Sequence, residues 1–556
     1  MREQAYDYVI VGAGSAGCVL AARLSEDPAV SVLLLEAGGP DRGLMSWMIH
    51  MPAALAEPLK GKRYNWAYQS EPEPYMDGRQ IYQPRGRVIG GSSSINGMAY
   101  VRGHARDYDR WAQKGLRGWD YSHVLPYFRK AETHEAGEDA YHGGDGPLRV
   151  TAGRLDHPLY NAWIEAGRQA GYPITEDMNG AQQEGLSRLD RTTWAGERWS
   201  AAKGYLQPAT TRPNLSVIDR ALVTKIGVEG GRATGVTYKR RGLERSVRAE
   251  REVILAGGAI NSPQLLLLSG IGPADELRAL GIEIVADRPG VGDNLQDHLE
   301  VYVQHACTKP VTLYPSLKPW NKLKIGMDWV FFRKGLGTTS HFEAGGFIRS
   351  RAGVEHPDLQ YHFLPIAINY DGSSPAGGHG FQAHVGPVRP TSRGKLKLRS
   401  ADPKAAPSIL FNYMASEQDR REMREGIKLT REIFAQAAFD PLRGAELSPG
   451  PTVTSDADLD AFVRAEGESA YHPSCTCKMG PDSDPLAVVD GAGRVYGVEG
   501  LRVVDASIMP DIVSGNLNAP TVMLAEKIAD DLRGRQALPP SEAAVWIHPQ
   551  WESQQR

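Results

Sequence analysis

The sequence is poor in cysteine, with only four in 556 residues. So few cysteines exclude a disulfide framework and are typical of proteins from a reducing compartment. Two of them, Cys475 and Cys477, are separated by a single residue, too close for a usual zinc-binding pair, and no second pair lies nearby. We therefore interpret these cysteines as structural and predict no metal site.

The sequence also lacks a long apolar run and an excess of either charge. Without a stretch of about 18 apolar residues, no transmembrane helix is expected. A strand pattern begins almost at Met1, which leaves no room for a signal peptide. A formal net charge of −3 gives no support to nucleic-acid binding. With 41% apolar and 23% charged residues, the sequence predicts a globular cytoplasmic protein, long enough for two domains.

A dinucleotide-binding pattern stands at the N-terminus. An apolar run ends at Val11 and leads into the Gly-x-Gly-x-x-Gly motif of residues 12–17, which opens a helical pattern. Gly12 allows the tight turn, Gly14 lets the backbone approach a pyrophosphate, and Gly17 lets helix and strand pack closely. The N-terminus of the helix offers free N–H groups to the phosphates.

A second apolar run, residues 32–35, ends at Glu36, whose carboxylate can accept hydrogen bonds from ribose hydroxyls. Strand, glycine motif, helix, second strand and acid together predict a Rossmann-type βαβ unit. The pattern fits FAD and NAD equally well.

Later segments suggest returns to the same sheet, and a separate unit follows a different pattern. Residues 252–259 and 501–505 have buried-strand patterns, and residues 521–532 a helical one. Residues 316–455 are rich in alternating, aromatic runs, which favours an antiparallel sheet that could cover the carboxyl ends of the parallel strands. We predict an α/β fold with a discontinuous nucleotide-binding domain (1–160, 205–315 and 456–535), a substrate domain (161–204 and 316–455) and a surface tail (536–556).

Further motifs identify a family. The segments RGRVIGGSSSINGM (85–98) and GGAINSPQLL (257–266) resemble the two signatures of the glucose–methanol–choline (GMC) flavoprotein oxidoreductases. The segments YHP (471–473) and SGNLN (514–518) resemble the catalytic segments of that family. The resemblance covers residues 4 to 534 and implies the GMC fold and FAD as the cofactor.

The resemblance also implies a set of cofactor contacts. Glu36 binds the adenosine ribose, Val223 supplies a backbone contact to adenine, and Asn96 lies near the reactive ring. Ile95 stands where some family oxidases carry a histidine that attaches FAD covalently, so FAD is expected to be bound non-covalently. The full set of expected cofactor residues is Gly12, Gly14, Gly17, Glu36, Gly90, Gly91, Ser92, Asn96, Gly97, Val223, Asp505 and Ala506.

Alcohol oxidation by a flavin needs a base for the hydroxyl proton and a donor for the developing alkoxide. The family motif points to His472 as the base, because histidine titrates near neutral pH. Asn516 is expected to hold the substrate oxygen. Asn518 is interpreted as the N-cap of the following helix.

Segments 61–68, 341–350 and 361–370 resemble the choline-oxidising members of the family. A quaternary ammonium has no hydrogen-bond donor, so its recognition relies on aromatic faces and a carboxylate. Glu343, in an apolar setting, is the expected carboxylate, and Trp66 and Tyr471 are the expected cage walls. Phe342 and Tyr361 are weaker candidates.

The resulting hypothesis is FAD-dependent oxidation of choline to betaine aldehyde and on to glycine betaine. The alternatives are a dehydrogenase for another primary alcohol, a redox-silent lyase on the flavin fold, and a flavin-binding module without activity. The expected electron acceptor is a respiratory quinone or another acceptor, with peripheral contact to the inner membrane.

Overall fold

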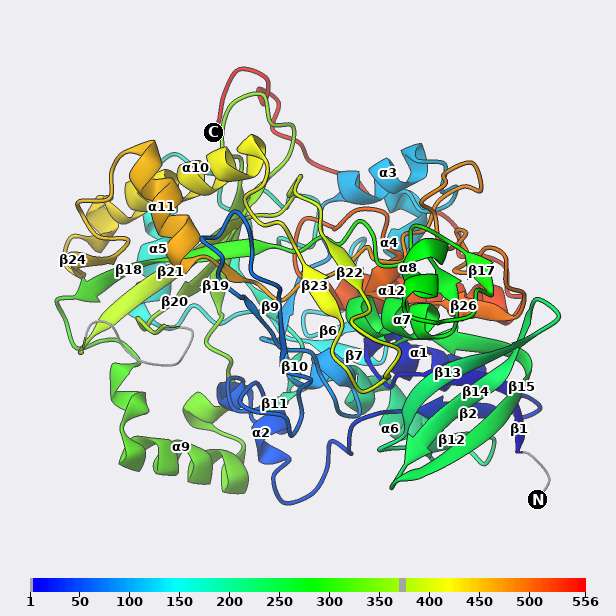
Figure 1. The fold of residues 1–556 in the computed structure, drawn as a ribbon. Helices are drawn as coiled ribbons and strands as arrows, with labels where there is room; N and C mark the ends of the chain where they lie inside the picture. The colour runs from blue at the N-terminus through cyan, green and yellow to red at the C-terminus, as the bar shows by residue number, and fades with distance from the viewer. Residues whose placement is uncertain (1–3, 370–376) are drawn as a thin grey trace.

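A computed structural model describes residues 4–369 and 377–556. Tyr370, the last residue of one segment quoted above, lies outside the described residues. Two large sheets organise this part of the chain (Figure 1). No helix among the described residues is both long and apolar enough to cross a membrane.

The first sheet has the strand order β12-β2-β1-β15-β14-β13, with β26 paired to β15. Its centre is parallel: β1 pairs in parallel with β2 and β15, and β15 with β26. The four residues of β2 are all buried, which explains their unbroken apolar pattern. The strands are β1 (Ala5–Val11), β2 (Val32–Leu35), β12 (Leu215–Ile218), β13 (Leu222–Glu229), β14 (Arg232–Arg240), β15 (Leu243–Leu255) and β26 (Leu501–Val503).

The second sheet is antiparallel, with the order β24-β18-β21-β20-β19-β8 and β25 paired to β18. The alternating run at 359–363 becomes β20, as predicted, whereas the run at 395–399 forms a separate small sheet with β23. The strands are β8 (Gly185–Arg188), β18 (Leu299–Cys307), β19 (Ala344–Ile348), β20 (Leu359–Leu364), β21 (Gly380–Pro387), β24 (Arg443–Ser448) and β25 (Glu468–Ser469).

The position of β18 bears on one expected boundary. This strand lies in the second sheet, although the predicted nucleotide-binding domain runs to residue 315. β25, from the predicted nucleotide-binding segment 456–535, also pairs with β18, so the domain boundaries stay a prediction. The sequence pattern of β18 alternates like that of an edge or sandwich strand, and only its pairing partners reveal which sheet it joins.

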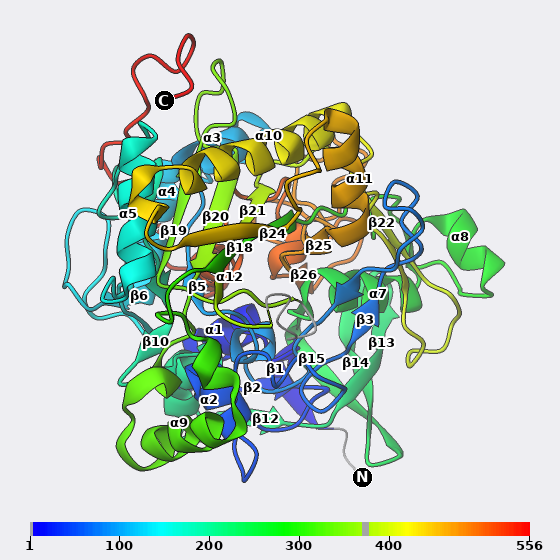
Figure 2. The same ribbon diagram turned by 90° about the vertical axis from the view of Figure 1, so that its left-hand side faces the viewer.

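Helices enclose both sheets. α1 and α12 pack on each other beside the parallel strands, and Figure 2 shows α10 lying across the second sheet. The helices are α1 (Ser15–Leu24), α2 (Trp47–His50), α3 (Ala105–Gln113), α4 (Tyr121–Ala131), α5 (Pro158–Gln169), α6 (Gln207–Ala209), α7 (Gly258–Leu268), α8 (Ala274–Ala279), α9 (Pro319–Phe332), α10 (Glu417–Phe434), α11 (Asp456–Glu466) and α12 (Asn518–Leu532).

Short strands complete the described fold. They pair mostly as two-stranded ribbons around the large sheets. They are β3 (Tyr68–Gln69), β4 (Tyr82–Gln83), β5 (Ala99–Tyr100), β6 (Glu132–His134), β7 (Leu148–Val150), β9 (Asp190–Arg191), β10 (Thr193–Trp194), β11 (Glu197–Arg198), β16 (Ile271–Gly272), β17 (Ala286–Asp287), β22 (Lys395–Lys397) and β23 (Ser408–Leu410).

The C-terminal residues form no regular element and follow the surface. The Trp546 N–H donates to the carbonyl of Ala181 at 2.9 Å, and the carbonyl of Trp551 accepts from the N–H of Gly353 at 2.8 Å. The Arg556 guanidinium contacts the Glu432 carboxylate. Two backbone hydrogen bonds and the ion pair of Arg556 therefore hold the end of the tail on the surface of the protein.

Candidate functional site

A large cavity lies between the two sheets, with a volume of about 1760 Å³. Residues at the carboxyl ends of β1 and β2 line one side, and Tyr302, His362 and His384 from the second sheet line the other. Pockets for one small molecule measure about 300–1,000 Å³. This cavity therefore has room for a dinucleotide and a small substrate together.

Glycines form the wall beneath the cavity. A Cβ on Gly17 would lie 1.9 Å from the carbonyl oxygen of Gly12, so α1 packs on its strand only because position 17 is glycine. Gly12 has a φ of +102°, and a Cβ there would meet the Ala256 carbonyl oxygen at 2.5 Å. Gly12 and Gly14 line the cavity, whereas Gly17 lies behind its wall.

Glu36 lies at the end of β2 and lines the same cavity. Its carboxylate accepts hydrogen bonds from the N–H groups of Ala13 at 2.9 Å and Gly38 at 2.6 Å. Burial raises the pKa of Glu36 to about 7, and the two backbone donors oppose that rise. The carboxylate thus joins the glycine turn to β2 at the place where the ribose is expected.

The segment 85–98 crosses the cavity beside the glycine turn. A Cβ on Gly91 would lie 2.6 Å from the Cα of Gly14, so the two glycine segments touch backbone to backbone. Gly91, Ser92, Asn96 and Gly97 line the cavity. Gly90 does not line the cavity. Its N–H donates to the Ala13 carbonyl at 2.7 Å, which attaches segment 85–98 to the glycine turn.

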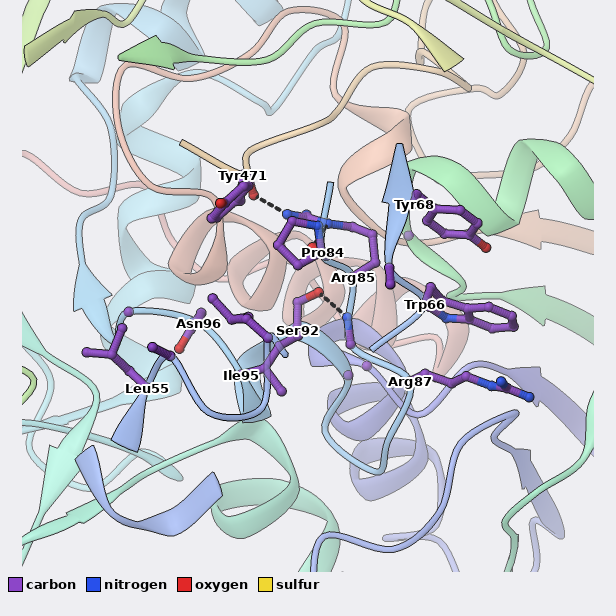
Figure 3. Close-up of a pocket in the computed structure, with 18 of the residues that line it drawn as sticks. Leu55, Trp66, Tyr68, Pro84, Arg85, Arg87, Ser92, Ile95, Asn96 and Tyr471 are labelled. Atoms are coloured by element: carbon purple, nitrogen blue, oxygen red, sulfur yellow. Dashed lines mark hydrogen bonds between the residues drawn. The ribbon is translucent and has the colours of Figure 1, made fainter. Parts of the chain in front are cut away.

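Figure 3 shows how the side chains of this segment lie. The Ser92 hydroxyl accepts from the N–H of Gly86 at 3.1 Å. The Asn96 amide oxygen accepts from Arg198 at 2.7 Å, and Ile95 lies between Ser92 and Asn96 on the cavity wall. An isoleucine side chain at this position offers no atom for a covalent bond to a cofactor.

Val223 and Asp505 reach the cavity from two different strands of the first sheet, both on the side of β15 that faces away from β1. Val223 belongs to β13, and Asp505 with Ala506 follows β26; all three residues line the cavity. The Asp505 carboxylate accepts from the Gly258 N–H at 2.8 Å and the Ser262 hydroxyl at 2.6 Å. Burial raises the pKa of Asp505.

His472 and Asn516 come together in the cavity, although 44 residues separate them. The Asn516 Nδ2 lies 3.1 Å from the His472 Nε2. Asn518 is not the N-cap predicted for it: α12 begins at Asn518 after Leu517, and the Asn518 amide donates to the Ser15 hydroxyl at 2.9 Å instead. Contact with α1 therefore decides the role of Asn518.

A chain of hydrogen bonds determines the tautomer of His472. The His298 Nε2 lies 3.1 Å from the Val388 carbonyl oxygen, which can only accept, so this nitrogen carries the proton. Burial lowers the pKa of His298 to about 4, so the ring is neutral and its Nδ1 is an acceptor. The His472 Nδ1, 3.1 Å from that nitrogen, must then donate, which leaves the His472 Nε2 unprotonated.

The same reasoning orients Asn516. The Gln360 amide nitrogen donates to the Asn516 amide oxygen at 2.9 Å, so the Asn516 amide nitrogen faces His472. Burial, followed by the proximity of His298, His362 and Arg85, lowers the pKa of His472 well below its ordinary value. His472 is therefore neutral at neutral pH and presents a lone pair into the cavity beside an amide donor.

Asp297 holds the loop that carries His472. Its carboxylate accepts from the N–H groups of His298 at 2.9 Å and His472 at 2.7 Å, and from the Tyr413 hydroxyl at 2.5 Å. Tyr471 has a φ of +66°, and its carbonyl accepts from Arg85 at 2.7 Å (Figure 3). These contacts hold the strained turn that points His472 at the cavity.

The structure contradicts the expected role of Glu343. Its carboxylate forms an ion pair with the Arg191 guanidinium, accepts from the Thr339 hydroxyl, and accepts from the Arg154 N–H at 2.6 Å. Glu343 is not among the residues that line the cavity. The sequence shows an acid in an apolar setting, but its compensating cation is an arginine of the same chain and not a ligand.

The expected aromatic cage is only partly assembled. Tyr471 and Phe342 line the cavity near His472, and Phe342 packs edge-on against His362 and His384. Trp66 also lines the cavity, but the Arg87 guanidinium lies 4.6 Å from its ring centroid. Figure 3 shows Trp66 and Tyr471 on opposite sides of Arg85.

Tyr361 takes no part in the cavity. Its ring is fully buried, and its hydroxyl donates to the carbonyl of Gly426 on α10 at 3.3 Å. The alternating pattern of β20 directs this residue to the core side of the sheet, whereas Gln360 and His362 face the cavity side.

Comparison with known proteins identifies the family. Family models described as GMC oxidoreductase match residues 6–300 and 390–525. The chain is a GMC oxidoreductase. As a member of this family it is an alcohol oxidoreductase with FAD as its cofactor, and the glycine walls and the cavity described above fit that group.

Relatives of this GMC oxidoreductase include the mitochondrial choline dehydrogenase of Homo sapiens, 58% identical over 97% of this chain and 92% of that protein. The oxygen-dependent choline dehydrogenase of Pseudomonas fluorescens is 59% identical over 98% of this chain and 96% of that protein. Among solved structures, pyridoxine 4-oxidase from Mesorbium loti is similar with a TM-score of 0.86 and 33% identity, over 96% of this chain and all of that one.

Sequence reasoning missed three residues of this GMC oxidoreductase: His298, Gln360 and Glu300. Glu300 lines the cavity, and its carboxylate lies 3.1 Å from the His384 Nδ1. The short segment QDHLE (296–300) places an acid, a histidine and another acid within four residues, at the start of β18. This cluster of titratable groups beside a predicted strand is the sequence feature that could have pointed to His298 and Glu300.

Proposed function

We propose that this GMC oxidoreductase oxidises choline to betaine aldehyde and then to glycine betaine. The observation that carries the proposal is the position of Glu300. This carboxylate lines the same cavity as His472 and Asn516, and Tyr302, Phe342 and Tyr471 also line it. A carboxylate and aromatic rings are the groups that hold a trimethylammonium ion, and a base with an amide donor is what its hydroxyl needs.

The charge at this end of the cavity favours a cation. Glu300 and Glu468 stand opposite each other where β18 pairs with β25. Burial first, and then the charges of these two carboxylates, raises the pKa of Tyr471, whereas Arg85 lowers it; since Glu468 also pairs with Arg79, the proposal relies on the charge of Glu300. A positively charged substrate gains from this field, whereas an uncharged alcohol does not.

In the proposed mechanism the His472 Nε2 accepts the proton of the substrate hydroxyl. The Asn516 amide donates to the oxygen as it becomes an alkoxide, and the hydrogen bond from Gln360 keeps that amide turned toward it. The glycine segments around Gly12 and Gly91 would hold FAD, which would supply the hydride acceptor for the substrate carbon. The hydrate of the aldehyde again offers a hydroxyl, so the same residues can act a second time.

The experiment compares choline with its uncharged isostere, 3,3-dimethylbutan-1-ol, in two carboxylate variants. We expect Glu300→Gln to lower kcat/KM for choline at least about tenfold more than for the isostere, because one or two partly desolvated charge contacts are lost. Glu343→Gln is the matched control: it affects both alcohols alike, since Glu343 pairs with Arg191 outside the cavity.

Equal losses for both alcohols in Glu300→Gln would contradict Glu300 as the ammonium site. A wild-type enzyme with no preference for choline would favour a dehydrogenase for another primary alcohol. A flavin that stays oxidised on anaerobic mixing with every alcohol would point to a redox-silent lyase.

We further propose that the electrons pass to a quinone of the membrane. Apolar residues of α9 and of the segment before it line the mouth of the cavity, among them Leu317, Leu323 and Val330, which suits an apolar acceptor. The bacterial relatives are named oxygen-dependent, and oxygen is the competing acceptor. Turnover on choline, measured side by side with a soluble quinone analogue and with oxygen alone, distinguishes the two.

A further inference from the structure

Two neighbouring strands place a row of polar side chains beside the carboxylate of Glu300. β18 and β21 lie side by side in the second sheet, with Tyr302 opposite His384 and Gln304 opposite Gln382 (Figure 1). Since side chains alternate along a strand, Glu300, Tyr302 and Gln304 share one face of the sheet with Gln382 and His384. Of these five residues, all but Gln304 line the cavity. The row therefore connects the cavity wall to a residue behind it.

The amide of Gln382 has a fixed orientation. The backbone N–H of Ile368 donates to the Gln382 amide oxygen at 2.8 Å, and a backbone N–H can only donate. The amide nitrogen of Gln304 donates to the same oxygen at 2.9 Å and to the Ile368 carbonyl at 3.0 Å. The amide nitrogen of Gln382 must therefore point the other way, toward His384.

This orientation determines the tautomer of His384. The Gln382 amide nitrogen lies 2.8 Å from the His384 Nε2 and can only donate, so that ring nitrogen is an acceptor without a proton. The proton of the neutral ring is then on Nδ1, which lies 3.1 Å from a carboxylate oxygen of Glu300 and donates to it. Tyr302 stacks on the ring with centroids 3.7 Å apart, which holds the ring plane.

The surroundings of His384 contain several other groups that titrate. From the described elements, those that line this part of the cavity are Glu300, Tyr302, His362, Glu468, Tyr471 and His472. Burial lowers the pKa of His362 to about 4, so that ring is neutral at neutral pH. Glu468 forms an ion pair with Arg79. A neutral His384 thus supplies a hydrogen bond to Glu300 without adding a positive charge beside it.

We propose that His384 is a positioning residue for cation recognition, and that Gln382 holds it in the neutral form that donates to Glu300. With its proton on Nε2 instead, the ring would turn a lone pair on Nδ1 toward the carboxylate and repel it. With both nitrogens protonated, the ring would bring a positive charge next to Glu300 and oppose a trimethylammonium group. This inference rests on the proposed function, because it concerns how Glu300 recognises the cation of the substrate.

The test compares two isosteric variants, His384→Asn and His384→Leu, of which only the first keeps a donor for Glu300. The readout is the Kd of tetramethylammonium for the FAD-loaded enzyme, measured by calorimetry, because this cation has no hydroxyl and needs no turnover. We expect His384→Leu to weaken binding at least about fivefold, whereas His384→Asn stays within about twofold of wild type. The loss in His384→Leu should grow as the pH falls to about 6, since a carboxylate without its donor binds a proton more readily.

A second measurement tests the tautomer in the wild type, so it holds even if His384→Leu fails to bind FAD. In protein with ¹⁵N-labelled histidine, the NMR signals that are missing from His384→Asn belong to His384. We expect a neutral ring with its proton on Nδ1. A proton on Nε2 or a charged ring at neutral pH would overturn the proposal.

Equal Kd values for His384→Asn and His384→Leu, or no binding of tetramethylammonium to the wild type, would also overturn it. Choline turnover with a soluble dye is measured on the same samples. The expected Kd values without choline turnover would refute the proposed oxidation and leave the role of His384 standing.

Discussion

At the scale of the residue, the proposed chemistry depends on the hydrogen bonds that connect the His472 Nδ1 to His298 and His298 to Val388. His298 lies between the Val388 carbonyl and the His472 Nδ1, so it determines which nitrogen of His472 can act as a base. His298 is also the first neighbour, after burial itself, that lowers the pKa of His472. His298 is thus a positioning residue, and its loss should change both the rate and its dependence on pH.

We expect His298→Ala to lower kcat/KM by about 10- to 100-fold with FAD content unchanged, because part of His472 then holds its proton on Nε2. The variant also loses a neighbour that lowers the pKa of His472, so this pKa rises. A base works above its pKa, and the acidic limb of the pH profile of kcat/KM should therefore move to higher pH. For comparison, His472→Ala should lose about 10²- to 10⁴-fold at every pH. An unchanged pH profile in His298→Ala would show that His298 has only a structural role.

At the scale of the element, α3 begins with an unusual cap. The His104 Nδ1 accepts from the Arg106 N–H at 3.1 Å, and the His104 N–H donates to Asp107 at 2.8 Å, which completes a capping box. The His104 ring stacks on that of His356 at 4.3 Å. Burial, followed by the charges of nearby arginines, lowers the pKa of His104 to about 3. The cap therefore requires a neutral ring.

We expect acid to weaken α3 through His104. An unfolded histidine has a pKa of about 6.5, so as pH falls from there toward 3 the unfolded chain binds a proton that the folded chain does not. The stabilisation from neutral His104 is complete above pH 6.5 and decreases by about 2 kcal/mol between pH 6.5 and 5. His104→Asn keeps a capping oxygen that does not titrate. The difference in unfolding free energy between wild type and variant, measured by urea at both pH values, should shift by that amount in favour of the variant; a constant difference would refute the cap's role.

At the scale of the whole molecule, the cavity separates two sheets that share few direct contacts across it. The parallel sheet supplies the glycine walls, and the antiparallel sheet supplies Tyr302, His362 and His384. FAD bound between them would contact both units. Its binding energy should therefore add directly to the stability of the folded chain.

We expect heat or acid to release FAD into the supernatant, since Ile95 offers no covalent attachment. The apoprotein should melt at a lower temperature than the holoenzyme. Added FAD at 100 times its Kd should restore about 2.7 kcal/mol. Melting curves and supernatant absorbance measure both effects. Flavin that remains with the precipitated protein would demonstrate a covalent bond.

The sequence by itself determined whatever depends on local pattern. The turn at Gly12, the strand before it and the acid at Glu36 are neighbours along the chain, so their spacing alone predicts the βαβ unit. The antiparallel sheet was equally readable from the alternation at β20. Family motifs added His472 and Asn516, whose proximity at 3.1 Å is a tertiary fact that no spacing predicts.

Only the tertiary structure decided between alternative partners for the same residue. Glu343 and Glu300 are both acids in largely apolar surroundings, and the sequence pointed to Glu343, whereas only Glu300 lines the cavity. Arg191 folds onto Glu343 from 152 positions away, whereas β18 carries Glu300 into the cavity wall. The tautomer of His472 likewise depends on His298 and Val388, which reach it from other strands and loops. A buried charge needs a partner of opposite charge. That partner can come from any part of the chain, so only the tertiary structure shows which residue it is.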